Sequence, residues 1–207
     1  MFEILTVCTG NICRSPFAEL VLKERLADLP GRVHSAGTMD LGARPMSRDA
    51  QRLAQLNGIA PEATAAHRSD VLLESALSGP DLIVVMTREH RRRVLELAPS
   101  RMRAVFTARE FARLAAATPV SEIEAELDRT GPAPSERLRA ACSVLAAHRG
   151  MAPAPARSED DDVIDPYRLP WETYQLMASQ LMPALDEITR VVRLSQGGDR
   201  RDVGAAE

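Results

Sequence analysis

Two short segments rich in apolar and β-branched residues constrain the fold of this chain more than any other feature. They are FEILTV at residues 2–7 and DLIVVM at residues 81–86. Nearly continuous apolar runs of this length are typical of strands that are buried on both faces, as in a parallel sheet. The segments RVHSAG at 32–37 and RAVFT at 103–107 predict two further strands.

Stretches with helical spacing separate these four predicted strands. Phe17, Leu20 and Val21 share one helical face after the first strand, and Ser47 is placed to cap a helix that stops at Gly58. A basic helix, REHRRRVLEL, follows the third strand. This alternation predicts an α/β fold, a single domain in which helices cover both faces of a four-stranded parallel sheet.

The second half of the chain departs from the alternation. Residues 108–157 are rich in Ala and Arg and predict a helical insertion before the C-terminal helix. That last helix begins near Trp171, and its apolar residues recur at spacings of three and four, which indicates one buried stripe. We therefore expect one domain over residues 1–195 and a flexible tail over residues 196–207.

Composition excludes several classes of protein. The hydrophobic fraction of 45% and the net charge of −3 exclude a wholly disordered chain, and no apolar run is long enough to span a membrane. The small net charge gives no reason to expect nucleic acid or a membrane surface as partner. Three cysteines are too few for a disulfide scaffold or a four-cysteine zinc site. The N-terminus carries no export signal, so we expect a cytoplasmic protein.

The segment between the first strand and the first helix carries the chemistry. It reads CTGNICRS, with Cys8 and Arg14 separated by five residues. A loop of this length can curl around one tetrahedral oxyanion with its backbone N–H groups pointing inward, and the following helix adds its positive end. Arg14 can grip two phosphate oxygens with its planar fork. The same field favours the thiolate of Cys8, which is the nucleophilic form.

The spacing of Cys8 and Arg14 also has a structural interpretation. A cysteine that ends a strand can simply belong to the core, with an exposed arginine nearby. The position of the loop favours the phosphate cradle, because parallel sheets bind ligands at the carboxyl ends of their strands.

Several motifs together resemble the low-molecular-weight protein tyrosine phosphatases. VCTGNICRSP comes first, SAGT follows at 35–38, and DLIVVMT lies at 81–87. The motif DPY at 165–167 and ETY at 172–174 complete the pattern. Order and spacing match over residues 2–106 and again over 162–192, while the stretch between them is longer than is usual in the family. The resemblance implies a phosphatase that forms a phosphocysteine and needs neither a metal nor another cofactor.

The resemblance also implies a role for each matching residue. Cys8 would attack phosphorus, and Asp165 would act as general acid and then as general base. Ser15 would donate a hydrogen bond to the Cys8 thiolate, Ser35 would brace Asn11, and Tyr167 would form a wall against the substrate ring. The phosphate would be bound by the loop residues Thr9, Gly10, Asn11, Ile12, Cys13 and Arg14.

Alternatives stay open for some of these residues. Asp165 could only turn the chain before a proline, and Tyr167 could be a packing residue. Cys13 is either a small residue packed behind the loop or a thiol that resolves oxidised Cys8. Arg168 follows Asp-Pro-Tyr where relatives often carry a second aromatic residue, which makes Trp171 a candidate for aryl recognition.

Two further sets of residues carry less weight. The four histidines show no metal-ligand pattern, and we assign them no chemistry. The arginines at positions 88 and 91–93 are either a solvated face or a docking patch for an acidic partner.

The sequence therefore predicts a phosphatase that hydrolyses phosphate monoesters. The expected partner is a phosphotyrosine-containing protein or a small aryl phosphate. Two other functions remain as alternatives. Arsenate reduction uses the same loop, but it passes a disulfide along further cysteines, and only Cys13 and the distant Cys142 accompany Cys8. A non-catalytic module that binds phosphate would keep the loop and lose the acid, whereas Asp165 is present.

Overall fold

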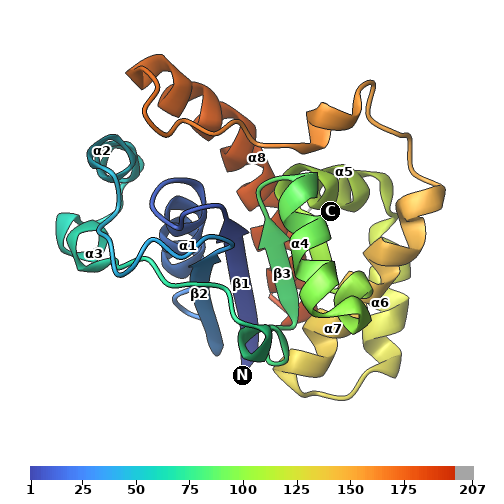
Figure 1. The fold of residues 1–207 in the computed structure, drawn as a ribbon. Helices are drawn as coiled ribbons and strands as arrows, with labels where there is room; N and C mark the ends of the chain where they lie inside the picture. The colour runs from blue at the N-terminus through green and yellow to red at the C-terminus, as the bar shows by residue number, and fades with distance from the viewer. Residues whose placement is uncertain (199–207) are drawn as a thin grey trace, which may run out of the picture.

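The computed structural model describes residues 1–198 and contains one parallel sheet (Figure 1). Its strand order is β2-β1-β3-β4, and each pair of neighbouring strands runs parallel. The fold class predicted from the sequence is confirmed. The strands are β1 (Phe2–Cys8), β2 (Gly31–Gly37), β3 (Leu82–Val85) and β4 (Val105–Thr107).

Helices and short 3-10 segments connect the strands and continue beyond the last one. The helices are α1 (Arg14–Arg25), α2 (Arg48–Leu56), α3 (Pro61–Ala66), α4 (Arg88–Leu97), α5 (Ala108–Ala117), α6 (Val120–Arg129), α7 (Pro134–Ala147) and α8 (Trp171–Ser195). The 3-10 segments are Glu74–Leu77, Pro99–Arg103, His148–Gly150 and Ser158–Asp161.

The hydrophobic cores on the two faces of the sheet differ in size. Ile4, Leu82 and Phe106 point into the larger core, to which α1, α5, α7 and α8 contribute. Leu5 and Ile83 point to the opposite face, where α4 and the segment before β3 cover a smaller core. This alternation follows from the period of two in a strand, and both faces are dry because every strand residue of β3 is buried.

Local capping explains where several helices begin. The Ser47 hydroxyl accepts a hydrogen bond from the backbone N of Ala50 at 3.3 Å, so the predicted cap of α2 is confirmed. Gly58, which follows this helix, has a φ of +87°, a conformation that favours glycine. Thr107 caps α5: its hydroxyl accepts a hydrogen bond from the backbone N of Glu110, and its own backbone N donates to the Glu110 side chain. This cap lets α5 begin directly after β4.

The helices after β4 belong to the core. Side chains of α5 and α7, among them Phe111 and Leu138, are fully buried in the larger cluster. Asp81, just before β3, is buried and fixes α7 to the sheet. Its Oδ1 accepts hydrogen bonds from Ser135 Oγ at 2.7 Å and Arg139 Nε at 2.6 Å, and its Oδ2 accepts one from the backbone N of Glu3 at 2.9 Å.

The end of the chain is described only in part. Gln196, where the predicted tail begins, donates from Nε2 to the carbonyl of Pro134 at 3.2 Å. The rest of that predicted tail, residues 199–207, lies outside the described residues. Within residues 1–198, no helix has both the length and the apolar character needed to cross a membrane.

We expect Asp81→Ala to destabilise the protein by about 2–3 kcal/mol, because a charged acceptor of three hydrogen bonds is removed from a buried position. Arg139→Ala should cost clearly less, because the Arg139 side chain is half exposed and Asp81 keeps its hydrogen bonds from Ser135 and from the backbone N of Glu3 in that variant. Urea unfolding followed by circular dichroism measures both values. A cost below about 0.5 kcal/mol for Asp81→Ala, the range of ordinary surface substitutions, would contradict this anchoring role.

Candidate active site

The loop between β1 and α1 curls around the thiol of Cys8. Cys8 is the last residue of β1, and only 2% of it is exposed. Its Sγ lies 3.0 Å from Ser15 Oγ and accepts a hydrogen bond from the backbone N of Asn11 at 3.3 Å. Hydroxyl and amide donors of this kind stabilise a negative charge on sulfur. The loop therefore brings two polar groups, the backbone N of Asn11 and the Ser15 hydroxyl, into contact with the thiol.

Asn11 fixes the curl of the loop. Its φ is +53°, in the left-handed region that few residues other than glycine adopt. Its Nδ2 donates to Ser15 Oγ at 2.9 Å and to Ser35 Oγ at 2.7 Å, and its Oδ1 accepts from the backbone N of Asp70 at 2.9 Å. Ser35 in turn donates to Glu19. Side-chain bonds to three segments thus hold a strained backbone in place.

The exit of β2 packs directly against this loop. The backbone N atoms of Thr38 and Met39 donate to the carbonyls of Cys8 and Thr9, each at 2.9 Å. A Cβ on Gly37 would lie 2.8 Å from the carbonyl oxygen of Thr9, closer than real contacts allow. A glycine is therefore required here so that the two backbones can approach.

Arg14 and Asp165 meet beside the thiol although they lie 151 positions apart. Arg14 is 3% exposed, and its Nη2 donates to Asp165 Oδ2 at 2.5 Å and to Thr9 Oγ1 at 3.2 Å. Its Nη1 donates to the carbonyl of Val163 at 3.3 Å. Its Nε is buried and has no partner within the described residues. Arg14 is thus held in place and keeps a donor for an oxyanion.

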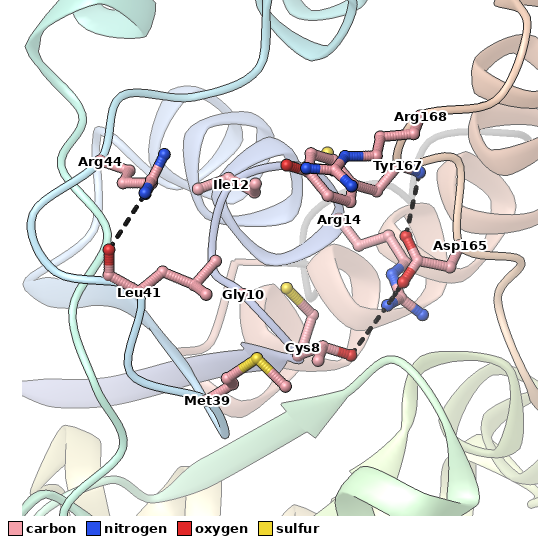
Figure 2. A pocket seen from close by; sticks show the side chains of 12 residues that line it. Cys8, Gly10, Ile12, Arg14, Met39, Leu41, Arg44, Asp165, Tyr167 and Arg168 are labelled. Atoms are coloured by element: carbon pink, nitrogen blue, oxygen red, sulfur yellow. Dashed lines mark hydrogen bonds and ion pairs between the residues drawn. The ribbon is translucent and has the colours of Figure 1, made fainter.

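The cleft above the thiol has a volume of about 380 Å³ (Figure 2). Ile12, Leu41 and the exposed Met39 supply apolar walls, and Tyr167 closes the side next to Asp165. Such walls suit a flat, apolar ring. The cleft is lined by Cys8, Thr9, Gly10, Ile12, Cys13, Arg14, Met39, Leu41, Arg44, Asp165, Tyr167 and Arg168.

Most of the predicted site residues therefore come together, with two qualifications. Asn11 and Ser15 are fully buried, so they support the loop from behind and do not line the cleft. The idea that Trp171 completes the aryl site is wrong. Its ring stacks on Tyr174 with centroids 6.3 Å apart, and the guanidinium of Arg52 covers it at 4.2 Å, so it takes part in packing at the start of α8.

His90 is a residue of the site that sequence reasoning missed. Its Nε2 lies 2.9 Å from Thr9 Oγ1, the same hydroxyl that accepts a bond from Arg14. Its Nδ1 lies 2.9 Å from Thr87 Oγ1, at the cap of α4. Burial, with the nearby Arg14 charge as a second cause, lowers the pKa of His90 to about 4. The imidazole is therefore neutral at physiological pH and links α4 to the loop.

A second histidine lies on the other side of the loop. His67 Nε2 is 2.8 Å from the carbonyl oxygen of Asn11. This contact ties the stretch before β3 to the loop. Its position next to the left-handed residue adds a further bond to the most strained point of the loop.

The other two cysteines are buried thiols. Cys13 Sγ lies 3.2 Å from Ser47 Oγ and 3.9 Å from the hydroxyl of Tyr174, and burial raises its pKa to about 11. Burial raises the pKa of Cys142 in α7 to about 12. Both therefore stay protonated at neutral pH, which favours packing roles. No cluster that could hold a metal ion occurs in residues 1–198.

Comparison with known sequences places the loop in a family context. The family described as low molecular weight phosphotyrosine protein phosphatase matches residues 3–124. The low molecular weight protein-tyrosine-phosphatase Etp of Escherichia coli (strain K12) is 40% identical over 98 residues, which are 47% of this chain and 62% of that relative. The chain thus spans less than two thirds of this relative's length. A protein-arginine-phosphatase of Geobacillus stearothermophilus is 34% identical over 111 residues, 53% of this chain and 71% of the relative.

Solved structures share the fold. The YwlE arginine phosphatase from Geobacillus stearothermophilus superposes with a TM-score of 0.66 at 24% identity, covering 96% of this chain and 97% of the other. A low molecular weight protein tyrosine phosphatase from T. tengcongensis gives a TM-score of 0.63 at 25% identity, covering 92% and 99%. The helices after β4 are therefore compatible with the same overall architecture.

The depressed pKa of His90 predicts an acid-sensitive contribution to stability. Because the folded pKa of about 4 lies below the ordinary 6.5, the unfolded state binds more protons between these values. Stability is therefore complete above about pH 6.5 and falls as pH drops toward 4. Between pH 7 and pH 5, wild type should lose about 2 kcal/mol more than His90→Gln. Urea unfolding at both pH values tests this, and equal losses would contradict a buried neutral imidazole.

Proposed function

The chain belongs to the low molecular weight phosphotyrosine protein phosphatase family, and we propose that it hydrolyses phosphate monoesters, with phosphotyrosine in proteins as the substrate class. The observation that carries this proposal is the meeting of Cys8, Arg14 and Asp165 around one cleft with apolar walls. A nucleophile, an oxyanion clamp and a proton donor are what such a hydrolysis needs. A small aryl phosphate would enter the same cleft.

The proposed reaction has two steps. In the first, the Cys8 thiolate attacks phosphorus, the bond from phosphorus to the tyrosyl oxygen breaks, and Asp165 gives that oxygen a proton. In the second, Asp165 takes a proton from water, the water oxygen attacks phosphorus, and the sulfur leaves as thiolate. Ser15, 3.0 Å from Cys8 Sγ, stabilises the thiolate at the start and at the end. The chemistry uses no metal, because loop N–H groups and Arg14 stabilise the phosphoryl oxygens.

Substrate binding would rearrange the pair of Arg14 and Asp165. Both N–H groups of Arg14 Nη2 already have acceptors, Asp165 and Thr9, so a phosphoryl group must compete with the carboxylate. A dianion that also collects the loop N–H groups has the advantage in this competition. Asp165 is then released beside the leaving oxygen. Its side chain is 48% exposed, which leaves room for this movement.

Phosphoarginine is a second candidate substrate, because one relative is named a protein-arginine-phosphatase. The charges of the cleft favour the aryl ester. Three arginines line it, and the single carboxylate among its lining residues, Asp165, is paired with Arg14. A substrate that carries a guanidinium group would add a further cationic group next to Arg44 and Arg168. The apolar side chains of Ile12, Met39 and Leu41 contact a phenol ring more favourably.

Two functions from other classes fit the site less well. Arsenate reduction would need further thiols, but Cys142 is fully buried in α7 and Cys13 has a strongly raised pKa. A non-catalytic phosphate-binding module would need no proton donor. The Asp165 carboxylate lies in the cleft, 2.5 Å from the arginine that would hold the phosphate, and this position supports a catalytic role.

The phosphocysteine is tested by a brief exposure of the protein to an aryl phosphate, followed by acid quenching and mass spectrometry of peptides. We expect a phosphate adduct on Cys8 in wild type and none in Cys8→Ser, whose hydroxyl is hardly ionised at neutral pH. Turnover of the aryl phosphate should be abolished in Cys8→Ser. Cys142→Ala serves as the matched control and should keep the adduct. Measurable hydrolysis by Cys8→Ser would rule out the mechanism.

The role of Asp165 is tested with leaving groups of different basicity. Asp165→Asn should slow hydrolysis of phenyl phosphate by about 10²–10⁴-fold, because the basic phenolate needs a proton as it departs. It should slow a nitrated phenyl phosphate much less, since that phenolate leaves without help. Steady-state kinetics on the two esters give the comparison, and equal losses for both would remove Asp165 from the acid role.

A further inference from the structure

We propose that Arg44 and Arg168, on two sides of the cleft, together form a second anion site, which selects phosphotyrosine with acidic residues on both sides of it in the polypeptide. This inference rests on the proposed function and specifies its substrate. The two arginines come from segments far apart in sequence, and both line the cleft. Figure 2 shows them on opposite sides of Ile12 in that view.

The segment that carries Arg44 is held firmly at the backbone. The backbone N of Arg44 donates to Ser69 Oγ at 2.9 Å, and its carbonyl accepts from the backbone N of Ser69 at 2.8 Å. The side-chain Nε donates to the carbonyl of Leu41 at 3.1 Å. Only Nε is used in this contact, so the terminal nitrogens are oriented without being neutralised. Such preorganisation reduces the entropy lost when an anion binds.

Arg168 is held in an unusual backbone conformation. Its φ is +62°, and among the described residues that are not glycine only Asn11 shares a positive value. The guanidinium lies over the ring of Tyr167, 5.1 Å from its centroid. Strained residues of this kind concentrate at sites of function. Here Asn11 shapes the loop from behind the cleft, and Arg168 places a cation beside Tyr167 in the cleft itself.

The charge of this pair is not compensated by the protein. Within residues 1–198, neither Arg44 nor Arg168 has an ion pair with a carboxylate. Asp165 is the one acidic residue that lines the cleft, and Arg14 engages it. The phosphoryl group would be bound at Arg14 and the loop. Arg44 and Arg168 would then be free to attract a separate negative charge on the substrate.

The other basic cluster shows the contrast. On α4, Arg92 pairs with Glu89 and Glu96, and Arg93 pairs with Glu96. These arginines therefore belong to a solvated face whose charges cancel locally. The arginine cluster of α4, which stands out in the sequence, is thus largely neutralised by glutamates. Arg44 and Arg168 at the cleft are not neutralised in this way. An acidic peptide segment around phosphotyrosine is the partner that complements them.

The test compares two phosphotyrosine peptides that differ only in having Glu or Gln on both sides of the phosphotyrosine. Wild type should show a kcat/KM about 2- to 30-fold higher for the Glu peptide at low salt, the range for two exposed ion pairs. The difference should lie mainly in KM and shrink at high ionic strength. Phenyl phosphate is measured in parallel as a substrate without flanking residues. Equal kcat/KM for the two peptides would overturn the inference and leave the proposed function intact.

Variants then assign the preference to the two arginines. Arg44→Gln and Arg168→Asn should each reduce the ratio between the peptides, and the double variant should bring it close to one. Asn is chosen at 168 because it tolerates the left-handed backbone. Arg168→Lys keeps the charge and should keep most of the ratio, and Arg92→Gln on α4 should not change it. A ratio that persists in the double variant would contradict the assignment.

Binding separates this inference from the proposed function. If wild type fails to hydrolyse phenyl phosphate and both peptides, the proposed function is wrong. The same peptides are then titrated into Cys8→Ser by calorimetry. Tighter binding of the Glu peptide, lost in Cys8→Ser combined with the two arginine substitutions, would support the anion site. Equal affinities would overturn it.

Discussion

The side chain of Asn11 is the contact on which the site depends. Its amide reaches the loop itself at Ser15, the strand β2 at Ser35 and the segment before β3 at Asp70. These bonds hold a left-handed residue that would otherwise relax, and that residue turns its own backbone N toward Cys8 Sγ. The curled shape of this loop is therefore a product of tertiary structure. The loop sequence supplies the donors, and two other segments, β2 and the segment before β3, help to supply the shape.

The second constraint joins the two ends of the fold. Arg14 begins α1, while Asp165 follows the long helical segment after β4, and their ion pair closes the cleft. The intervening helices do not disturb this meeting, because α7 is fixed to the sheet through Asp81 and packs into the core. The helices between β4 and Asp165 thus extend the larger core, and Asp165 still reaches Arg14.

The sequence predicted what is local and missed what depends on packing between distant segments. The strands, the loop and the cap at Ser47 were all predictable, because each follows from neighbouring residues. His90 was missed because Thr9, its partner, lies 81 positions away and nothing near His90 indicates it. The apolar stripe of α8 correctly indicated packing for Trp171. Its suggested part in aryl recognition, which rested on Arg168 standing where relatives often carry an aromatic residue, was wrong, because in the fold the ring contacts Tyr174 and the guanidinium of Arg52.

The arginines of the chain likewise show that contacts between distant segments could not be predicted from the sequence. The run of arginines on α4 is conspicuous in the sequence, yet Glu89 and Glu96 lie three or four positions from Arg92 and neutralise it on the helix surface. Arg44 and Arg168 are inconspicuous, because 124 positions separate them. The fold brings both to one cleft and places no carboxylate against either within residues 1–198. The charge that a cleft offers to a ligand therefore depends on which arginines have no carboxylate partner in the fold. A count of basic residues along the chain does not reveal it.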